Sequence, residues 1–151
     1  NFSKEGMGEI EINSSTILDS DHSPQNVIDY TNNKKFFSSK NLEDSWISFN
    51  FKNHPVLITH YTIQSDFANQ DESQNPKNWV IEGSNDGKKW SIIDEQKDVA
   101  FTNPISFVHT FSIQNINYTP FKFVRMRLTG KNWSDKDYLQ LGEIEFYGNI
   151  Y

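Results

Sequence analysis

Residues 78–90 read NWVIEGSNDGKKW, and their pattern is the clearest local indication of the fold. Apolar residues lie on both sides of a polar centre, and Asn85-Asp86-Gly87 provides the residue types of a tight turn. The stretch therefore predicts a β-hairpin that joins strands at 79–84 and 90–93. A phosphate-binding loop does not fit, because it needs four residues between its glycines and a helix after them, whereas three residues separate Gly83 from Gly87.

Alternating side chains predict further strands on either side of this hairpin. In residues 46–51, Ile47, Phe49 and Phe51 alternate with more polar neighbours, which is the period of a half-buried strand. The same alternation predicts inward-facing residues in four other strands: Leu57, Thr59, Tyr61 and Ile63; Phe107, His109, Phe111 and Ile113; Val124, Met126 and Leu128; Ile144 and Phe146. The best helical candidate is one turn over 23–28, capped by Ser23 and opened by Pro24. Short strands separated by turns predict an all-β sandwich or barrel.

Length, charge and cysteine content bound the class of protein. The chain has 151 residues, a size that suits one domain with a core of its own, so we expect residues 9–151 to form that domain and 1–8 to be a tail or a cut from a longer protein. No apolar run approaches the ~20 residues of a membrane helix. The net charge of −6 argues against binding to nucleic acid or membrane lipid. The absence of cysteine excludes thiol catalysis and favours an intracellular location, without settling it.

The sequence holds no residue pattern that indicates catalysis. It has no Gly-x-Ser-x-Gly elbow, and acidic residues in its polar loops, such as Asp135 and Asp137, are expected to be solvated charges. The histidines lack the spacing of metal ligands: His22, His54, His60 and His109. Four Asn-x-Ser/Thr triplets, one of them at Asn132, are expected by chance in a chain so rich in asparagine. We therefore predict that the protein is not an enzyme.

Five segments, in order, resemble the coagulation factor 5/8 type C family, whose members are also called discoidin-like domains. The segments are 26–29 (NVID), 45–51 (SWISFNF), 78–90, 123–130 (FVRMRLTG) and 142–148 (GEIEFYG). The resemblance covers nearly the whole chain and implies a discoidin-like jelly-roll β-sandwich. Within this family, the sequence is most similar to cysteine-free members found within larger intracellular proteins. The resemblance implies a ligand-recognition module of a larger protein, with the ligand bound by loops at one end of the sandwich.

Glycan is the first ligand class that the resemblance implies. A sugar site needs one aromatic face with polar groups around it. The resemblance places such a site on a long polar loop and on the loop before the last strand, with these residues: Asp66, Asn69, Asn75, Lys77, Trp133 and Tyr138. The alternative for Trp133 is that it packs down as an anchor of its loop. Relatives that bind galactose-like sugars often carry an arginine at the start of the long loop, where this chain has Gln64-Ser65-Asp66.

Protein docking or scaffolding is the alternative function. The absence of cysteine, the resemblance to intracellular members and the missing arginine favour it. A docking site predicts a wide patch of exposed apolar residues, such as Phe67 and Phe101, rather than a pocket.

The resemblance also implies one structural calcium ion near the start of the fold. Its ligands would be Asn26, Asp29 and Glu143, with backbone carbonyls completing the six to eight oxygens that calcium requires. The glycine that usually follows the aspartate is Tyr30 here. The alternative is that Asp29 caps backbone amides and that Glu143 pairs with a neighbouring arginine.

The remaining large side chains are expected to be structural. Arg125 and Arg127 share one face of a strand, and their mid-strand position favours ion pairs with Glu82 or Glu145 over anion binding. Three tryptophans fall within strand patterns and are expected in the core or on a sheet surface: Trp46, Trp79 and Trp90.

Overall fold

The computed structural model describes residues 10–28, 35–65, 74–101, 108–114 and 118–151. No helix in these ranges is long and apolar enough to cross a membrane. In chain order the elements are β1 (Glu11–Ser14), the 3-10 helices η1 (Ser20–His22) and η2 (Pro24–Ile28), β2 (Phe37–Ser38), β3 (Trp46–Asn50), β4 (Val56–Gln64), β5 (Trp79–Ser84), β6 (Ser91–Gln96), β7 (Val108–Ser112), β8 (Phe123–Leu128), β9 (Gln140–Leu141) and β10 (Glu143–Ile150).

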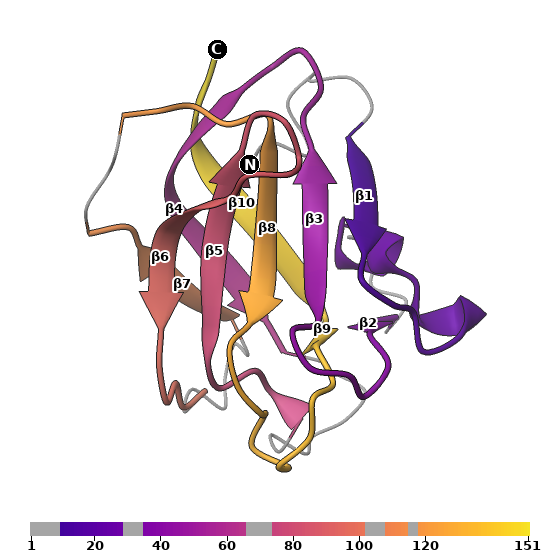
Figure 1. Cartoon of the computed structure of the whole chain (residues 1–151). Helices are drawn as coiled ribbons and strands as arrows, with labels where there is room; N and C mark the ends of the chain where they lie inside the picture. The colour runs from indigo at the N-terminus through magenta and orange to yellow at the C-terminus, as the bar shows by residue number, and fades with distance from the viewer. Residues whose placement is uncertain (1–9, 29–34, 66–73, 102–107, 115–117) are drawn as a thin grey trace.

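Two antiparallel sheets lie face to face across the core (Figure 1). The larger sheet has the order β1-β3-β8-β5-β6, and the smaller one has the order β10-β4-β7. A short third pairing joins β2 to β9. Apart from β5 and β6, neighbouring strands in the two sheets are not consecutive in the sequence, which is typical of the jelly roll. The predicted all-β jelly-roll sandwich is confirmed.

The hairpin and the helical turn form where the sequence predicts them. β5 pairs with β6, and Gly87 in the connection has φ +71°, a conformation that glycine adopts without a Cβ penalty. The Asp86 carboxylate accepts hydrogen bonds from the backbone amides of Lys88 and Lys89, each at 2.8 Å, which holds the turn. Pro24 opens η2 as expected.

The inner faces of the two sheets form one apolar core. Ile47 and Phe49 of β3 and Val124 and Met126 of β8 are buried, as the alternation predicts. Trp79 is fully buried between the sheets, which confirms its expected place in the core. The structure describes Phe101 but not Phe67. Phe101 is 6% exposed and packs against Trp79, so the prediction that it lies on an exposed docking patch is wrong.

The prediction of which β4 side chains face the core is wrong for the first half of the strand. The register of the β10–β4 pairing shifts between Tyr147 and Gly148. Tyr147 lies opposite His60, and Gly148 lies opposite Ile58. Thr59 is therefore the extra residue of a β-bulge. The core therefore contains Val56 and Ile58 before the bulge and Tyr61 and Ile63 after it. A shift of one residue exchanges the two faces of a strand, and alternation alone does not reveal it.

Candidate functional site

The loops that the sequence analysis assigns to ligand binding meet at one end of the sandwich. β8 ends there, and β3 and β5 begin there (Figure 1). Backbone hydrogen bonds join the segments, from the Leu128 amide to the Ser45 carbonyl at 2.9 Å and from the Thr129 amide to the Asn78 carbonyl at 3.1 Å. Residues 39–45, 74–78 and 129–139 thus form one cluster, which we call the loop end.

Trp133 presents its ring at the loop end while its nitrogen holds it in place. The side chain is 45% exposed, and its indole N–H donates to the Val99 carbonyl at 2.8 Å. The Lys77 ammonium lies 4.4 Å from the centre of the ring, a cation–π distance, and 3.6 Å from the Asp98 carboxylate. Trp133 is therefore an anchor of its loop and also an exposed aromatic surface, so both predicted roles are compatible with its position.

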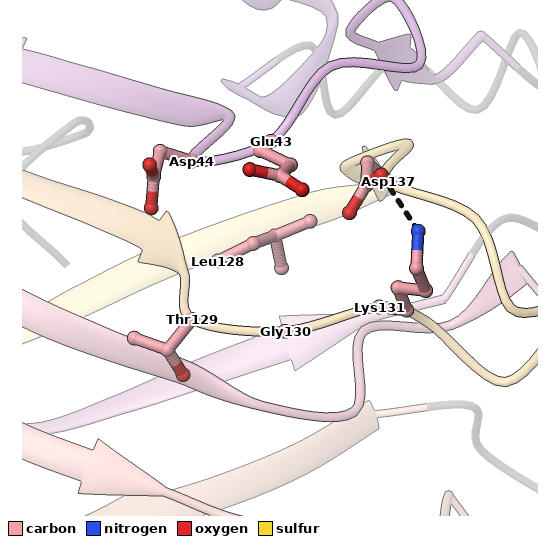
Figure 2. Close-up of a pocket in the computed structure, with 7 residues that line it drawn as sticks. All are labelled: Glu43, Asp44, Leu128, Thr129, Gly130, Lys131 and Asp137. Carbon is pink, nitrogen blue, oxygen red and sulfur yellow. Dashed lines mark hydrogen bonds and ion pairs between the residues drawn. The ribbon is translucent and has the colours of Figure 1, made fainter.

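A pocket of about 340 Å³ lies on the same loop end. Leu128 occupies its centre, with the carboxylates of Glu43 and Asp137 on one side (Figure 2). Seven residues line it: Glu43, Asp44, Leu128, Thr129, Gly130, Lys131 and Asp137. The lining combines one apolar side chain with three carboxylates and one ammonium group, and such a mixture suits a small polar ligand with an apolar face.

Ion pairs order the charged groups of the pocket. Lys131 donates to Asp137 at 3.0 Å, and this hydrogen bond raises the pKa of Lys131 above its usual value. Arg127 on β8 reaches Asp44, in the loop before the neighbouring strand β3, at 3.5 Å. Asp137 is expected from the sequence to be a solvated loop charge, but its side chain is only 18% exposed. That expectation is wrong because residues 131–137 fold back and bring the two charges together.

The predicted ligand-binding residues separate into three groups. Lys77 and Trp133 are in contact at the loop end. Asn75 is buried, with 7% of its surface exposed, and Tyr138 is half-buried. Asp66 and Asn69 lie outside the described residues.

Sequence reasoning missed the pocket residues Glu43, Asp44 and Thr129. Glu43 and Asp44 lie far from residues 128–137 in the chain, and only the sheet order brings the two segments together. The polarity of the loop at 131–137 was the one signal in the sequence for this side of the site.

The predicted calcium ligands are only partly described. The Asn26 side chain is buried, and its amide nitrogen donates to the carbonyls of Asp21 and Phe36, both at 2.9 Å. This amide joins two segments of the chain, and its oxygen is the only side-chain atom of Asn26 that could serve a metal. Asp29 lies outside the described residues, and Glu143 opens β10. Within the described ranges, no group of three or more histidine, cysteine, aspartate or glutamate side chains could hold a metal ion. The calcium site stays a prediction.

The outer face of the larger sheet carries the predicted arginine pairs. Glu82 on β5 is 4% exposed and accepts from Arg125 Nε at 2.6 Å and from Arg127 Nη2 at 3.0 Å. Burial opposes the charged form of Glu82, but the hydrogen bonds from the two arginines outweigh it and lower its pKa. Arg125 also stacks on Trp90 at 4.0 Å, which places that tryptophan on the sheet surface. The pairing with Glu82 is confirmed, and these arginines serve the sheet rather than the loop end.

Comparison with known proteins assigns the class. A family model described as "F5/8 type C domain" matches residues 11–143. The chain belongs to the F5/8 type C domain family, which confirms the resemblance seen in the sequence.

Two curated proteins share part of the chain. It is 30% identical over 107 residues to a peptide-N(4)-(N-acetyl-beta-glucosaminyl)asparagine amidase of Arabidopsis thaliana, and the match covers 68% of this chain and 14% of that protein. It is 34% identical over 76 residues to the E3 ubiquitin-protein ligase hecd-1 of Caenorhabditis elegans, and that match covers 49% of this chain and 3% of the ligase. The chain thus corresponds to a small part of each relative.

Solved structures share the fold at low sequence identity. A module of Clostridium perfringens in complex with GalNAc-beta-1,3-galactose has a TM-score of 0.70 at 12% identity and covers 94% of this chain and 97% of its own. A chitosan-binding module 2 of Paenibacillus sp. IK-5 in complex with chitotriose has a TM-score of 0.69 at 19% identity, with 91% and 95% covered. A fucose-binding module of Streptococcus pneumoniae has a TM-score of 0.67 at 12% identity, with 92% and 91% covered. These likenesses show the fold.

Proposed function

We propose that this domain is a non-catalytic glycan-recognition module, and that the glycan binds at the loop end. The observation that carries the proposal is the arrangement of residues 131–137. This one loop exposes the fixed indole ring of Trp133 and also supplies Lys131 and Asp137 to a pocket of about 340 Å³. An aromatic surface and ordered carboxylates at the same end of the sandwich suit a sugar, because its C–H face is apolar and its hydroxyls are hydrogen-bond donors.

The acidic lining of the pocket guides the choice of ligand. Glu43, Asp44 and Asp137 outnumber Lys131, so the pocket favours ligands that donate hydrogen bonds or carry positive charge. The structural neighbours include modules described as binding chitosan, a polymer that carries amino groups. Chitotriose is therefore the first probe, followed by GalNAc-beta-1,3-galactose and fucose, which the names of two other neighbours contain.

The test is isothermal titration of the folded chain with each of the three sugars. We expect weak binding of at least one of them, and Trp133→Ala should abolish it because the aromatic surface is lost. Asp137→Asn should weaken it by removing the negative charge that pairs with Lys131. Tyr118→Ala is the matched control, since Tyr118 is 84% exposed and lies shortly before the start of β8, whereas the loop end lies where β8 ends. Binding that survives Trp133→Ala unchanged would reject the proposed site.

Protein docking is the second candidate, and one observation favours it. Three exposed aliphatic side chains lie on adjoining segments, with Ile17 41%, Leu18 39% and Leu42 53% exposed. The Leu18 amide donates to the Ser38 carbonyl at 2.9 Å, which brings residues 16–18 beside 38–40, and Leu42 follows two residues later. If folded protein binds none of the three sugars, this patch becomes the better candidate for ligand contact.

The proposed module would act inside a longer protein. The small shares of the two curated relatives that the chain matches, 14% and 3%, support this proposal. Other domains of the parent chain would then be its natural neighbours.

A further inference from the structure

Asn132 stands in the loop end between the pocket residue Lys131 and the exposed Trp133, and its own side chain is buried. It is 3% exposed, whereas Lys131 before it lines the pocket and Trp133 after it is exposed. Its amide nitrogen donates to Gln74 Oε1 at 3.0 Å and to the Tyr138 carbonyl at 3.3 Å. Its amide oxygen accepts from the backbone amides of Ser134 at 3.0 Å and Lys136 at 3.1 Å. An asparagine side chain has two donors and one oxygen with two lone pairs, so its full hydrogen-bonding capacity is used.

Gln74 completes a bridge between two loops. While its Oε1 accepts from Asn132, its Nε2 donates to the Ser134 hydroxyl at 3.0 Å. Gln74 belongs to the segment that leads to Lys77, and the Lys77 ammonium lies over Trp133. The bridge therefore holds the aromatic ring and the ammonium group that covers it in one arrangement.

We propose that Asn132, through Gln74, is the positioning residue of the glycan site, which holds Trp133 and the pocket residues Lys131 and Asp137 in their ligand-ready arrangement. This inference rests on the proposed function. Its physical reason is preorganisation: a loop that is already ordered loses less conformational entropy when a ligand binds. The turn itself would persist without the bridge, because the Asn132 carbonyl accepts from Asp135 and its amide donates to the Lys136 carbonyl.

Gln74 offers the sharper test, because its substitution leaves the turn around Asn132 untouched. Gln74→Ala removes both bonds of the bridge. Gln74→Glu is the conservative variant: its carboxylate can still accept from the Asn132 amide nitrogen and from the Ser134 hydroxyl, which can rotate to donate. Asn132→Asp removes the two donated bonds and keeps the two accepted ones. Asn13→Asp makes the same chemical change at an exposed site on β1 and serves as its control.

The first readout needs no ligand. In the full chain labelled with nitrogen-15, hydrogen exchange of the Trp133 indole N–H and of the amides of 132–139 reports the order of the loop. We expect exchange to be about tenfold faster in Gln74→Ala and Asn132→Asp than in the unaltered chain, because an inter-loop hydrogen bond is lost. Gln74→Glu and Asn13→Asp should leave it unchanged. Unaltered exchange in Gln74→Ala would overturn the proposal.

The second readout is affinity for whichever of chitotriose, GalNAc-beta-1,3-galactose and fucose binds the unaltered chain. We expect Gln74→Ala to weaken binding about tenfold at a temperature where every variant is folded, and Gln74→Glu to restore it. Weakening without restoration would reject the bridge as the cause. If none of these sugars binds the unaltered chain, the proposed function fails, while the exchange measurement still decides whether the bridge orders the loop.

Discussion

The ammonium nitrogen of Lys77 lies 4.4 Å from the centre of the Trp133 ring, although the two residues belong to different loops. Lys77 is also within 3.6 Å of Asp98, and Trp133 donates to the carbonyl of the next residue, Val99. Three segments of the chain therefore converge on a single exposed indole ring. This convergence distinguishes Trp133 from an aromatic residue that is exposed by accident.

Lys77→Met should loosen this arrangement without unfolding the domain. Methionine keeps most of the aliphatic packing and removes the charge, so we expect the free energy of unfolding to fall by about 0.5–1 kcal/mol, the range for a cation–π contact at an exposed site. Urea unfolding measures the loss. Quenching of the tryptophan fluorescence by a neutral quencher in solution should increase, because the Trp133 ring loses the side chain that covers it. Lys88→Met, on the exposed β5–β6 hairpin, is the control and should change neither quantity. If Lys77→Met lowers the free energy of unfolding no more than the control does, the contact between Lys77 and Trp133 does not stabilise the domain.

Glu82→Gln should destabilise the larger sheet by about 3 kcal/mol at neutral pH. Removal of one partner from a buried ion pair leaves the other charge uncompensated, and the partial exposure of Arg125 and Arg127 places the loss at the low end of the usual range. Equilibrium unfolding in urea measures it. Glu95→Gln removes an exposed carboxylate on β6 and should cost far less.

The same pair predicts how stability depends on pH. The folded-state pKa of Glu82 lies below its ordinary value of 4.5. The contribution of the Glu82 carboxylate to the free energy of unfolding is therefore fully present above about pH 4.5. It is lost as the pH falls through the lower folded-state pKa of Glu82. The stability difference between the unaltered chain and Glu82→Gln should shrink on acidification through this range. A difference that stays constant down to strongly acidic pH would contradict the ion-pair interpretation.

Tyr61→Phe should destabilise the core by about 1–3 kcal/mol, because it leaves a buried donor unsatisfied. The Tyr61 hydroxyl accepts from the Trp79 indole nitrogen at 3.0 Å and donates to Asp94 at 2.7 Å, and both aromatic side chains are fully buried. Burial, supported by the bond to Asp94, raises the pKa of Tyr61 far above its usual value, so the hydroxyl keeps its proton at every pH at which the domain is studied. Thermal unfolding measures the effect. Tyr118→Phe, which changes an 84% exposed residue, should leave the melting temperature unchanged.

Calcium should raise the melting temperature if the ligands predicted from the family resemblance bind it. Binding to the folded state alone stabilises a protein by mass action, so the increase should grow with calcium concentration and disappear with a chelator. Glu143→Gln should abolish the response because it removes a charged oxygen ligand. An unchanged melting temperature in calcium would reject the site and leave the Asn26 amide, with its bonds to Asp21 and Phe36, as the link between these segments.

The class of fold and most of the core residues are predictable from the residue pattern alone. A strand between a core and solvent must alternate apolar and polar side chains, so residues 46–51 and 123–128 show their buried faces directly. The turn at Asn85-Asp86-Gly87 was predictable for a local reason, since Gly87 must adopt a positive φ. The family resemblance implied Trp133 and Lys77 as residues of the proposed site, and the structure brings these two side chains into contact.

Contacts between residues that are far apart in the chain become visible only in the assembled sheets. The extra residue at Thr59 exchanges the faces of β4, and it is visible only in the pairing with β10. Glu82 lies opposite Arg125 in the larger sheet, whereas Glu145 lies on β10 of the smaller sheet, so Glu82 is the ion-pair partner. The pocket between Glu43 and Asp137 exists because the sheet order brings two distant loops to the same end of the sandwich. Local sequence records the preferences of neighbouring residues along the chain, whereas contacts between distant segments depend on strand order and register.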